Sequence, residues 1–228
     1  MTLRLKTGAL AVLTLAAAMG SASASELKAF NATYRASYNN MAANASMSLA
    51  PAGGNRWTYT MNVQNALAQL NRTATVDASG AQLRPLSNRE TTSMLVKKRA
   101  KQASFDWSGG QATWSGDVKA DRRGPIKLQA GDVDGMTLNL ALVRDALAGK
   151  PMRYRLIENG KAKPMAFTSA GKESVTVNGK AMQAIKVAGN DGDSQMTVWV
   201  VDGIPLPVRI QQRDDDGDTI DLRLQSVK

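Results

Sequence analysis

Short runs of alternating apolar and polar residues recur through most of this 228-residue chain, and turn-forming residues separate them. A clear example is the range 56–63, which carries apolar side chains at every second position: Trp57, Tyr59, Met61 and Val63. A period of two residues is typical of a β-strand with one buried face and one solvated face. The alternation therefore predicts a protein built mainly from antiparallel strands.

Asn-Gly and Asp-Gly pairs separate several of the runs in the C-terminal half, and such pairs are typical of tight β-hairpins. They are Asn159-Gly160, Asn178-Gly179, Asp202-Gly203 and Asp216-Gly217. We expect a hairpin over 106–115, with aromatic residues on both arms. The other expected strands are 29–37, 56–63, 71–76, one long or bent strand over 93–107, 152–158, 163–172, 173–177, 182–187, 195–201, 208–213 and 219–225.

One segment, from about residue 136 to 148, has the spacing of a helix instead, with Leu138, Ala141, Leu142 and Leu147 on one side. Two aspartates precede it, and we expect Asp132 and Asp134 to cap its N-terminus. Gly149 and Pro151 follow, and they are typical of a helix end.

Together these elements predict a mainly β fold: a single curved antiparallel sheet of about ten or more strands, with one inserted helix. A sheet of that size usually curls into a half-barrel or barrel, with a concave apolar face that the helix could cover. We expect one domain over 25–228; the alternative is a division into two domains near 119–127.

The amino terminus has the three parts of a secretory signal peptide over 1–24. Arg4 and Lys6 precede an apolar stretch over 8–19, and the small residues 22–24 predict cleavage after Ala24. The stretch is shorter than the roughly 20 residues of a membrane helix, although an uncleaved anchor is the alternative. We therefore expect a periplasmic protein with no transmembrane segment after residue 24, and the lack of cysteine excludes disulfides and a lipid anchor at the cleavage site.

Several segments, taken in order, resemble a family of secreted bacterial proteins called domain of unknown function 3108. The segments are Phe-x-Ala-x-Tyr at 30–34, Arg-Pro-Leu at 84–86, Ala-Ser-Phe-Asp-Trp at 103–107, the Asp-rich turn and Leu-rich helix at 132–147, and Thr-Val-Trp at 197–199 followed by Leu-Pro-Val at 206–208. The resemblance covers nearly the whole chain after residue 24. It implies export and a β-rich fold, and it assigns no catalytic residue.

The chain contains no histidine and no cysteine, which excludes catalysis by either side chain and zinc bound through them. We expect no enzyme activity, no metal and no cofactor. A Ser-x-x-Lys spacing at 169–172 is common by chance in such a lysine-rich chain, and no pair of central aspartates stands out for glycoside cleavage (Asp106, Asp117, Asp121, Asp132, Asp134). The acidic run at 214–218 lacks the remaining positions of a calcium loop, so we interpret it as a hairpin turn.

The net charge is +10, and most of the excess lies between residues 84 and 127, where ten basic residues stand against four acidic ones. The alternation places Lys97, Arg99 and Lys101 on one face of a strand, with Arg122 and Arg123 in a nearby loop. Such a patch attracts anionic components of the cell envelope, namely phospholipid head groups, lipopolysaccharide or other acidic glycans, and no nucleic-acid motif accompanies it. The alternative is a solvated face, or an edge strand protected from aggregation by lysine.

Five aromatic residues are candidates for lining a ligand cavity, although they could equally fill the core: Trp57, Tyr59, Phe105, Trp107 and Trp199. The tip of the 106–115 hairpin is the expected contact point for a lipid or partner. Two functions follow. The first is a non-catalytic periplasmic protein that binds or carries an apolar or amphipathic, lipid-like ligand in a concave sheet. The alternative is an envelope structural or assembly protein that acts through protein contacts and binds no small ligand; the sequence does not predict its oligomeric state.

Overall fold

The computed structural model describes residues 27–39, 41–190, 192 and 194–228. The expected signal peptide over 1–24 lies outside the described residues. Within the described part of the chain, no helix has the length and apolar character that crossing a membrane requires.

The described residues form fifteen strands in one sheet, one α-helix and one short 3-10 helix. The N-terminal strands are β1 (Phe30–Tyr38), β2 (Met41–Pro51), β3 (Arg56–Gln64), β4 (Ala68–Asp77), β5 (Arg84–Met94), β6 (Lys97–Asp106) and β7 (Gln111–Gly116). The 3-10 helix (Ala120–Arg122), β8 (Ile126–Lys127), β9 (Asp132–Val133) and α1 (Gly135–Leu147) follow. The C-terminal strands are β10 (Met152–Glu158), β11 (Lys161–Val177), β12 (Lys180–Asn190), β13 (Ser194–Val200), β14 (Arg209–Asp214) and β15 (Thr219–Val227).

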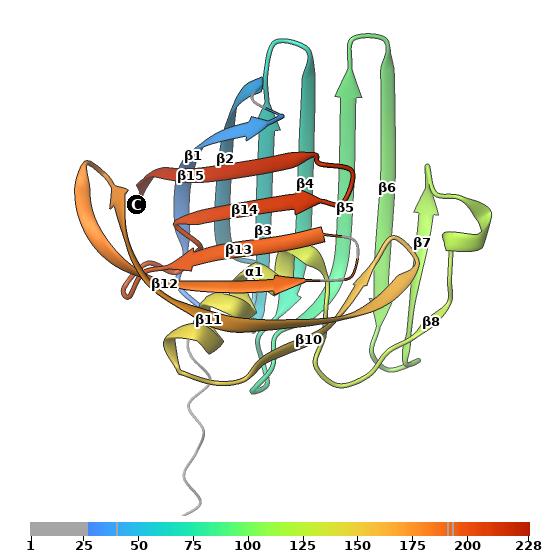
Figure 1. Ribbon diagram of the computed structural model, residues 1–228. Helices are drawn as coiled ribbons and strands as arrows, with labels where there is room; N and C mark the ends of the chain where they lie inside the picture. The colour runs from blue at the N-terminus through green and yellow to red at the C-terminus, as the bar shows by residue number, and fades with distance from the viewer. Residues whose placement is uncertain (1–26, 40, 191, 193) are drawn as a thin grey trace, which may run out of the picture.

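The sheet starts at β8, runs back through the chain to β1, continues from β1 to β15, and then runs back again to β9. Every pair of neighbours is antiparallel except β9 and β10. In Figure 1 the strands β2 to β7 stand upright, and β12 to β15 cross in front of β2, β3 and β4, so the sheet folds over on itself and does not close. The predicted half-barrel of ten or more strands with one helix is confirmed.

The core lies between the two layers, and α1 joins two of its apolar clusters. Met136, Leu140 and Ala141 pack with residues from β1 to β4 and from the C-terminal strands. Leu138 and Leu142, on the neighbouring side of the helix, pack with a second cluster that includes Val187, Val198 and Phe167. The helix therefore fills the space between the layers with apolar side chains on two sides.

The predicted helix is confirmed, with bounds within a residue or two of those expected. The Asp134 carboxylate accepts a hydrogen bond from the Thr137 backbone N–H at 2.7 Å, as an N-cap does. Gly149 follows the helix with φ of +62°, the left-handed conformation expected after a helix end. The prediction that Asp132 also caps the helix is wrong, because its carboxylate binds Arg155 instead.

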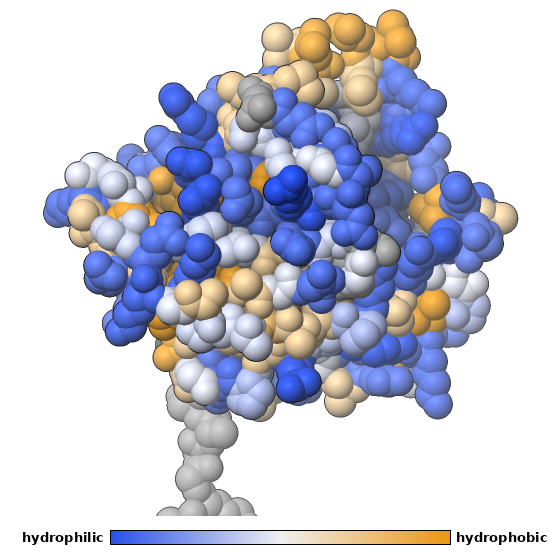
Figure 2. Space-filling model, in the orientation of Figure 1, coloured by the Kyte–Doolittle hydropathy of each residue, from blue (hydrophilic) through white to orange (hydrophobic). Residues whose placement is uncertain are grey.

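Three strand assignments needed correction. The expected long strand over 93–107 is two strands, β5 and β6, joined by a turn at Leu95 and Val96, two residues with no turn-forming signal. This turn lies within the hydrophobic cluster at the top of Figure 2. The expected strands 163–172 and 173–177 are one strand, β11, with an irregularity in its pairing between Ser169 and Lys172. The strand β2 was not predicted.

The edge strands β8 and β9 are only two residues long and do not pair with each other in the described structure. The two edges of the sheet are joined by side-chain contacts instead. Arg155 of β10 donates from Nη1 to the Asp132 carboxylate on β9 at 2.7 Å and to the Lys127 carbonyl oxygen on β8 at 3.1 Å. Ile157 of β10, which is fully buried, packs beside Phe105 and Trp114 of β6 and β7. We call this junction between β8 and the β9–β10 pair the seam.

The seam depends on a buried charge, since the Asp132 side chain is only 1% exposed. Replacing Arg155 with methionine would remove its cationic partner, and we expect a loss of about 3–5 kcal/mol in the free energy of unfolding. Arg223 is a matched control, because it pairs with Asp221 at 2.8 Å but is 60% exposed. Arg223→Met should cost no more than about 1 kcal/mol. Urea unfolding of both variants checks this, and equal losses would contradict the role of Arg155.

Gly160 ends the β10–β11 turn against the loop that holds Arg122. A Cβ at this position would lie 2.1 Å from the Arg122 carbonyl oxygen, whereas a Cβ at Gly179, in the equivalent Asn-Gly turn, would meet no atom within 4 Å. Both glycines have positive φ, +67° and +73°. Alanine should therefore cost about 1–2 kcal/mol at Gly179 from the backbone alone and about 1–3 kcal/mol more at Gly160 from the clash. Equal shifts of the two unfolding midpoints would show that the loop does not contact the turn.

Candidate functional site

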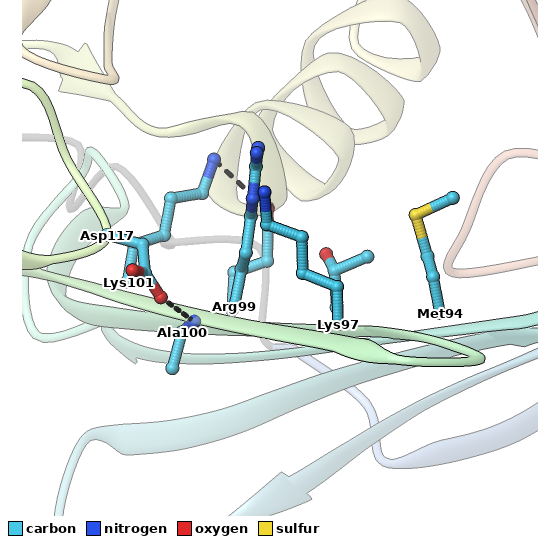
Figure 3. Close-up of a pocket in the computed structure, with 8 residues that line it drawn as sticks. Met94, Lys97, Arg99, Ala100, Lys101 and Asp117 are labelled. Atoms are coloured by element: carbon cyan, nitrogen blue, oxygen red, sulfur yellow. Dashed lines mark hydrogen bonds and ion pairs between the residues drawn. The ribbon is translucent and has the colours of Figure 1, made fainter.

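A groove opens on the inner face of the β5–β6 hairpin, with a volume of about 300 Å³. We call it the basic groove. Its lining residues are Glu90, Thr92, Met94, Lys97, Arg99, Ala100, Lys101 and Asp117. Figure 3 shows Lys97, Arg99 and Lys101 rising from the same side of β6 as a row of cations.

Strand register explains why these side chains share a face. In the β5–β6 ladder Met94 is opposite Lys97, Thr92 is opposite Arg99, and Glu90 is opposite Lys101. Directly paired residues of an antiparallel ladder point to the same side of the sheet. Further along β6 the same face carries Ala103 and Phe105, which are buried in the core. The inner face of β6 therefore changes from apolar at the core to cationic toward its hairpin tip.

The deep end of the groove is a network of paired charges. Glu90 accepts from Lys101 at 3.0 Å and from Arg72 of β4, and Arg72 also reaches Glu158 of β10 at 2.9 Å. Burial alone would raise the pKa of Glu90, but Arg72 and Lys101 outweigh it and hold the pKa below its ordinary value. Glu90 is therefore a carboxylate at neutral pH, and its charge is used within the protein.

The outer end of the groove carries cations without such partners. Asp117, the other acidic lining residue, accepts from the Ala100 backbone N–H at 2.7 Å, which anchors it to β6. Within the described residues, neither Lys97 nor Arg99 forms an ion pair or a side-chain hydrogen bond. These two side chains are therefore available to bind an anion from outside.

A second hollow, of about 360 Å³, lies on the other side of Lys101. Lys101, which lines the basic groove, donates to the side-chain oxygen of Asn159, which lines the second hollow, at 2.8 Å. Lining the second hollow are Lys119, Arg122, Leu156, Glu158, Asn159, Lys161 and Lys163. Of the basic loop residues expected near the strand, Arg122 lies here beside Asp121, while Arg123 is exposed and lines neither hollow.

The five aromatic candidates are packed against protein rather than gathered around one cavity. Tyr59 and Trp199 are at most 2% exposed, and Trp199 lies beneath the Arg209 guanidinium, 4.5 Å from its ring centre. Phe105 stacks edge-on with Trp114 and borders only a hollow of about 20 Å³. Trp57 is partly buried against the core, and Trp107 donates from Nε1 to the Pro85 carbonyl oxygen at 2.7 Å.

The central aspartates considered for catalysis each hold a piece of backbone or a neighbouring side chain. Asp106 accepts from the Ser108 and Gly109 backbone N–H groups in its turn. Asp134 accepts from Asn88 as well as capping α1, and burial raises its pKa above the ordinary value despite these hydrogen bonds. No cluster of three or more acidic side chains within metal-binding reach occurs among the residues that the structure describes. The expected turn at 214–218 is confirmed, closed by the Gly217 N–H on the Asp214 carbonyl oxygen.

Sequence reasoning missed two parts of the site. The ion pair between Arg72 and Glu158 joins residues 86 positions apart, and no local sequence pattern predicts it. The other part is the apolar β5–β6 turn at the mouth of the groove, where Leu95 and Val96 are 82% and 101% exposed. That turn could have been found from one signal, because an apolar pair directly followed by Lys97 and Lys98 is unusual inside a single strand.

Comparison with known proteins identifies the fold. A β-barrel-like protein of domain of unknown function DUF1849 from Brucella abortus aligns with a TM-score of 0.57 and 12% identity, over 89% of this chain and 98% of that one. MucB aligns with a TM-score of 0.33 and 10% identity, over 88% of this chain and 52% of that one. A DUF1329 family protein from Desulfovibrio piger aligns with a TM-score of 0.28 and 8% identity, over 90% and 87%. Only the first likeness is close enough to show a shared fold.

No curated protein matches the sequence significantly. One family model does, described as "Protein of unknown function (DUF3108)", and it covers residues 30–225. That range extends from the first strand to the last, so the match spans the complete sheet and the groove within it. The predicted resemblance is confirmed, and the chain belongs to the DUF3108 family.

Proposed function

We propose that this protein binds an anionic, amphipathic, lipid-like ligand in the basic groove and does not catalyse a reaction. The observation that carries the proposal is the row of cations on the inner face of β6, two of which have no partner among the described residues. A fold with a concave face and one unneutralised cationic side fits a binding protein for such a ligand.

The unpaired cations suit an acidic head group. Arg99 presents a planar guanidinium that can donate two parallel hydrogen bonds to a carboxylate or phosphate, and Lys97 adds a compact charge two residues closer to the hairpin tip. The acids of the groove do not compete for this position, because Glu90 is bound to Arg72 and Lys101 and Asp117 is bound to backbone. The ligand's charge would therefore meet Arg99 and Lys97 first.

An apolar strip lies beside the cations on the same inner face. Met94 and Thr92 line the groove, and the ladders place Leu70 of β4 opposite Thr92 and Val63 of β3 opposite Leu70. Leu70 and Val63 are only partly buried. A volume of about 300 Å³ is at the lower end of the range for ligand sites. The groove would hold a head group and the first part of a chain, and the rest would lie along the strip.

The proposal places the protein in the periplasm, on the basis of the expected signal peptide over 1–24. The absence of histidine and cysteine removes the commonest acid-base and nucleophilic side chains, which supports binding over catalysis. A role in assembly through strand addition has less support, since the edge strands β8 and β9 are two residues long and both contact Arg155.

The test is a fluorescence titration with a fluorescent long-chain fatty acid. We expect saturable binding, and a rise of about tenfold or more in Kd for the double variant Lys97→Gln/Arg99→Gln, because loss of charge-assisted contacts costs affinity. Native mass spectrometry of the purified protein should also detect a bound amphipath.

The matched control is Lys172→Gln/Lys180→Gln, which removes the same charge from exposed positions on the β11–β12 hairpin. This variant should bind like the unaltered protein. An equal loss in both double variants would mean that only the net charge matters, and a fatty acid that fails to bind the unaltered protein would refute the proposal. A long-chain trimethylammonium analogue should bind weakly, since its head group has the wrong sign.

A further inference from the structure

Exposed apolar side chains gather at one end of the sheet. Among the described residues seven large hydrophobic side chains are exposed, and six of them lie on the β1–β2, β3–β4 and β5–β6 turns: Tyr38, Met41, Leu67, Met94, Leu95 and Val96. Alternate turns of an antiparallel meander lie at the same end. Figure 1 shows the β3–β4 and β5–β6 turns side by side at the top of the molecule, and Figure 2 shows continuous hydrophobic surface over them.

The β3–β4 and β5–β6 tips touch, since the Leu95 N–H donates to the Leu67 carbonyl oxygen at 3.4 Å. We call Leu67, Met94, Leu95 and Val96 the apolar crest. The β1–β2 tip is different, because Tyr38 and Asn39 both bind Asp218 of the acidic β14–β15 turn. The apolar crest, in contrast, forms no hydrogen bond or ion pair with an acidic side chain in the described part of the chain.

Neither core packing nor turn geometry explains the apolar crest. Leu95 and Val96 have 82% and 101% of their surface exposed, so they pack against almost nothing. Neither residue has positive φ, so the turn is not of the kind that Asn159-Gly160 and Asn178-Gly179 form elsewhere in the sheet. Exposed apolar patches rimmed by polar residues mark interaction sites.

Charge around the apolar crest indicates the kind of partner. Lys97, Lys98 and Arg99 follow the tip directly, with Lys97 and Arg99 on the inner face and Lys98 on the outer face of β6. The sequence contains no acidic residue over 57–76 or over 91–105, the two stretches that carry these hairpin tips. Protruding apolar tips with cations just behind them match the two parts of an anionic bilayer surface, its acyl region and its head groups.

We infer that the apolar crest docks this protein on a bilayer surface that contains anionic lipids, with Leu95 and Val96 inserted and the basic residues behind them on the head groups. Docking requires no ligand in the basic groove. Met94 belongs to both features and Lys97 of the groove directly follows the apolar crest, so a docked protein would hold the groove open beside the head groups. This last consequence alone depends on the proposed function.

The first test is flotation of the protein with vesicles of phosphatidylglycerol and phosphatidylethanolamine. We expect binding that weakens as salt rises from about 0.05 to 0.5 M, and a partition coefficient about tenfold lower or more for Leu95→Ser/Val96→Ser, because two apolar side chains leave the acyl region. Leu147→Ser, which alters the exposed apolar residue at the far end of α1, should leave the coefficient unchanged. Equal binding of the unaltered protein and the crest variant, or equal binding to pure phosphatidylcholine vesicles, would overturn the inference.

The second test uses the absence of cysteine, which allows a single introduced thiol to carry an environment-sensitive dye. Dye at Val96→Cys should shift its emission to shorter wavelength with anionic vesicles. Dye at Ala81→Cys, in the exposed β4–β5 turn at the opposite end of the sheet, should not shift. No shift at either position, or the same shift at both, would refute insertion.

The two proposals can fail separately. Far-UV circular dichroism and the urea midpoint verify that Leu95→Ser/Val96→Ser is folded, as expected for side chains without packing contacts. If the crest variant loses vesicle binding but still binds the fluorescent fatty acid, docking and ligand binding are distinct properties. If the unaltered protein binds vesicles but not the fatty acid, the docking inference stands and the proposed function fails.

Discussion

The guanidinium of Arg155 joins two edges of the sheet that no backbone hydrogen bonds between strands connect. Elsewhere, fifteen strands are joined by ladders of backbone hydrogen bonds, but β8 and β9 are too short to pair across the gap. Arg155 contacts a carboxylate on one edge and a carbonyl oxygen on the other. The Asp132 carboxylate is almost completely buried and therefore needs a cation, which Arg155 of the paired strand β10 supplies. The same guanidinium reaches the Lys127 carbonyl oxygen of β8, and with the packing of Ile157 this contact joins the two edges of the sheet.

The position of the seam also determines which cations of the basic groove have partners within the protein. Where β10 approaches β4 and β6, Glu158 forms an ion pair with Arg72. Asn159, in the turn after β10, accepts a hydrogen bond from Lys101. Farther along β6, toward the hairpin tip, Lys97 and Arg99 have no ion-pair partner among the residues that the structure describes. One row of cations on one strand face is thus divided into an inner part that stabilises the fold and an outer part that is free for binding. Beyond that outer part, the same hairpin ends in the apolar crest.

Features that depend on neighbouring residues could be predicted from the sequence. The two-residue period of apolar side chains predicted most strands, and Asp134 and Gly149 marked the helix ends. The same alternation correctly placed Lys97, Arg99 and Lys101 on one face of a strand. Features that depend on distant residues could not. Asp132 resembles a capping residue locally, but its partner is 23 positions away in another strand. The Leu95-Val96 turn carries no glycine, asparagine or proline, so its position is set by register with β4 rather than by turn chemistry. Tyr59 and Trp199 are buried in the cluster that α1 joins, whereas Phe105 packs in a separate cluster with Trp114 and Ile157, and neither grouping could be predicted from neighbouring residues.

A seam of side chains behaves differently from a backbone ladder. Parting β8 from β10 would break the hydrogen bonds from Arg155 to the Lys127 carbonyl oxygen and separate Ile157 from Phe105 and Trp114, while the backbone ladders between paired strands stayed in place. The two layers would remain connected through the paired strands β1 and β15. Resistance to separation at the seam therefore comes from side-chain contacts, whereas at every other junction between neighbouring strands it comes from a backbone ladder.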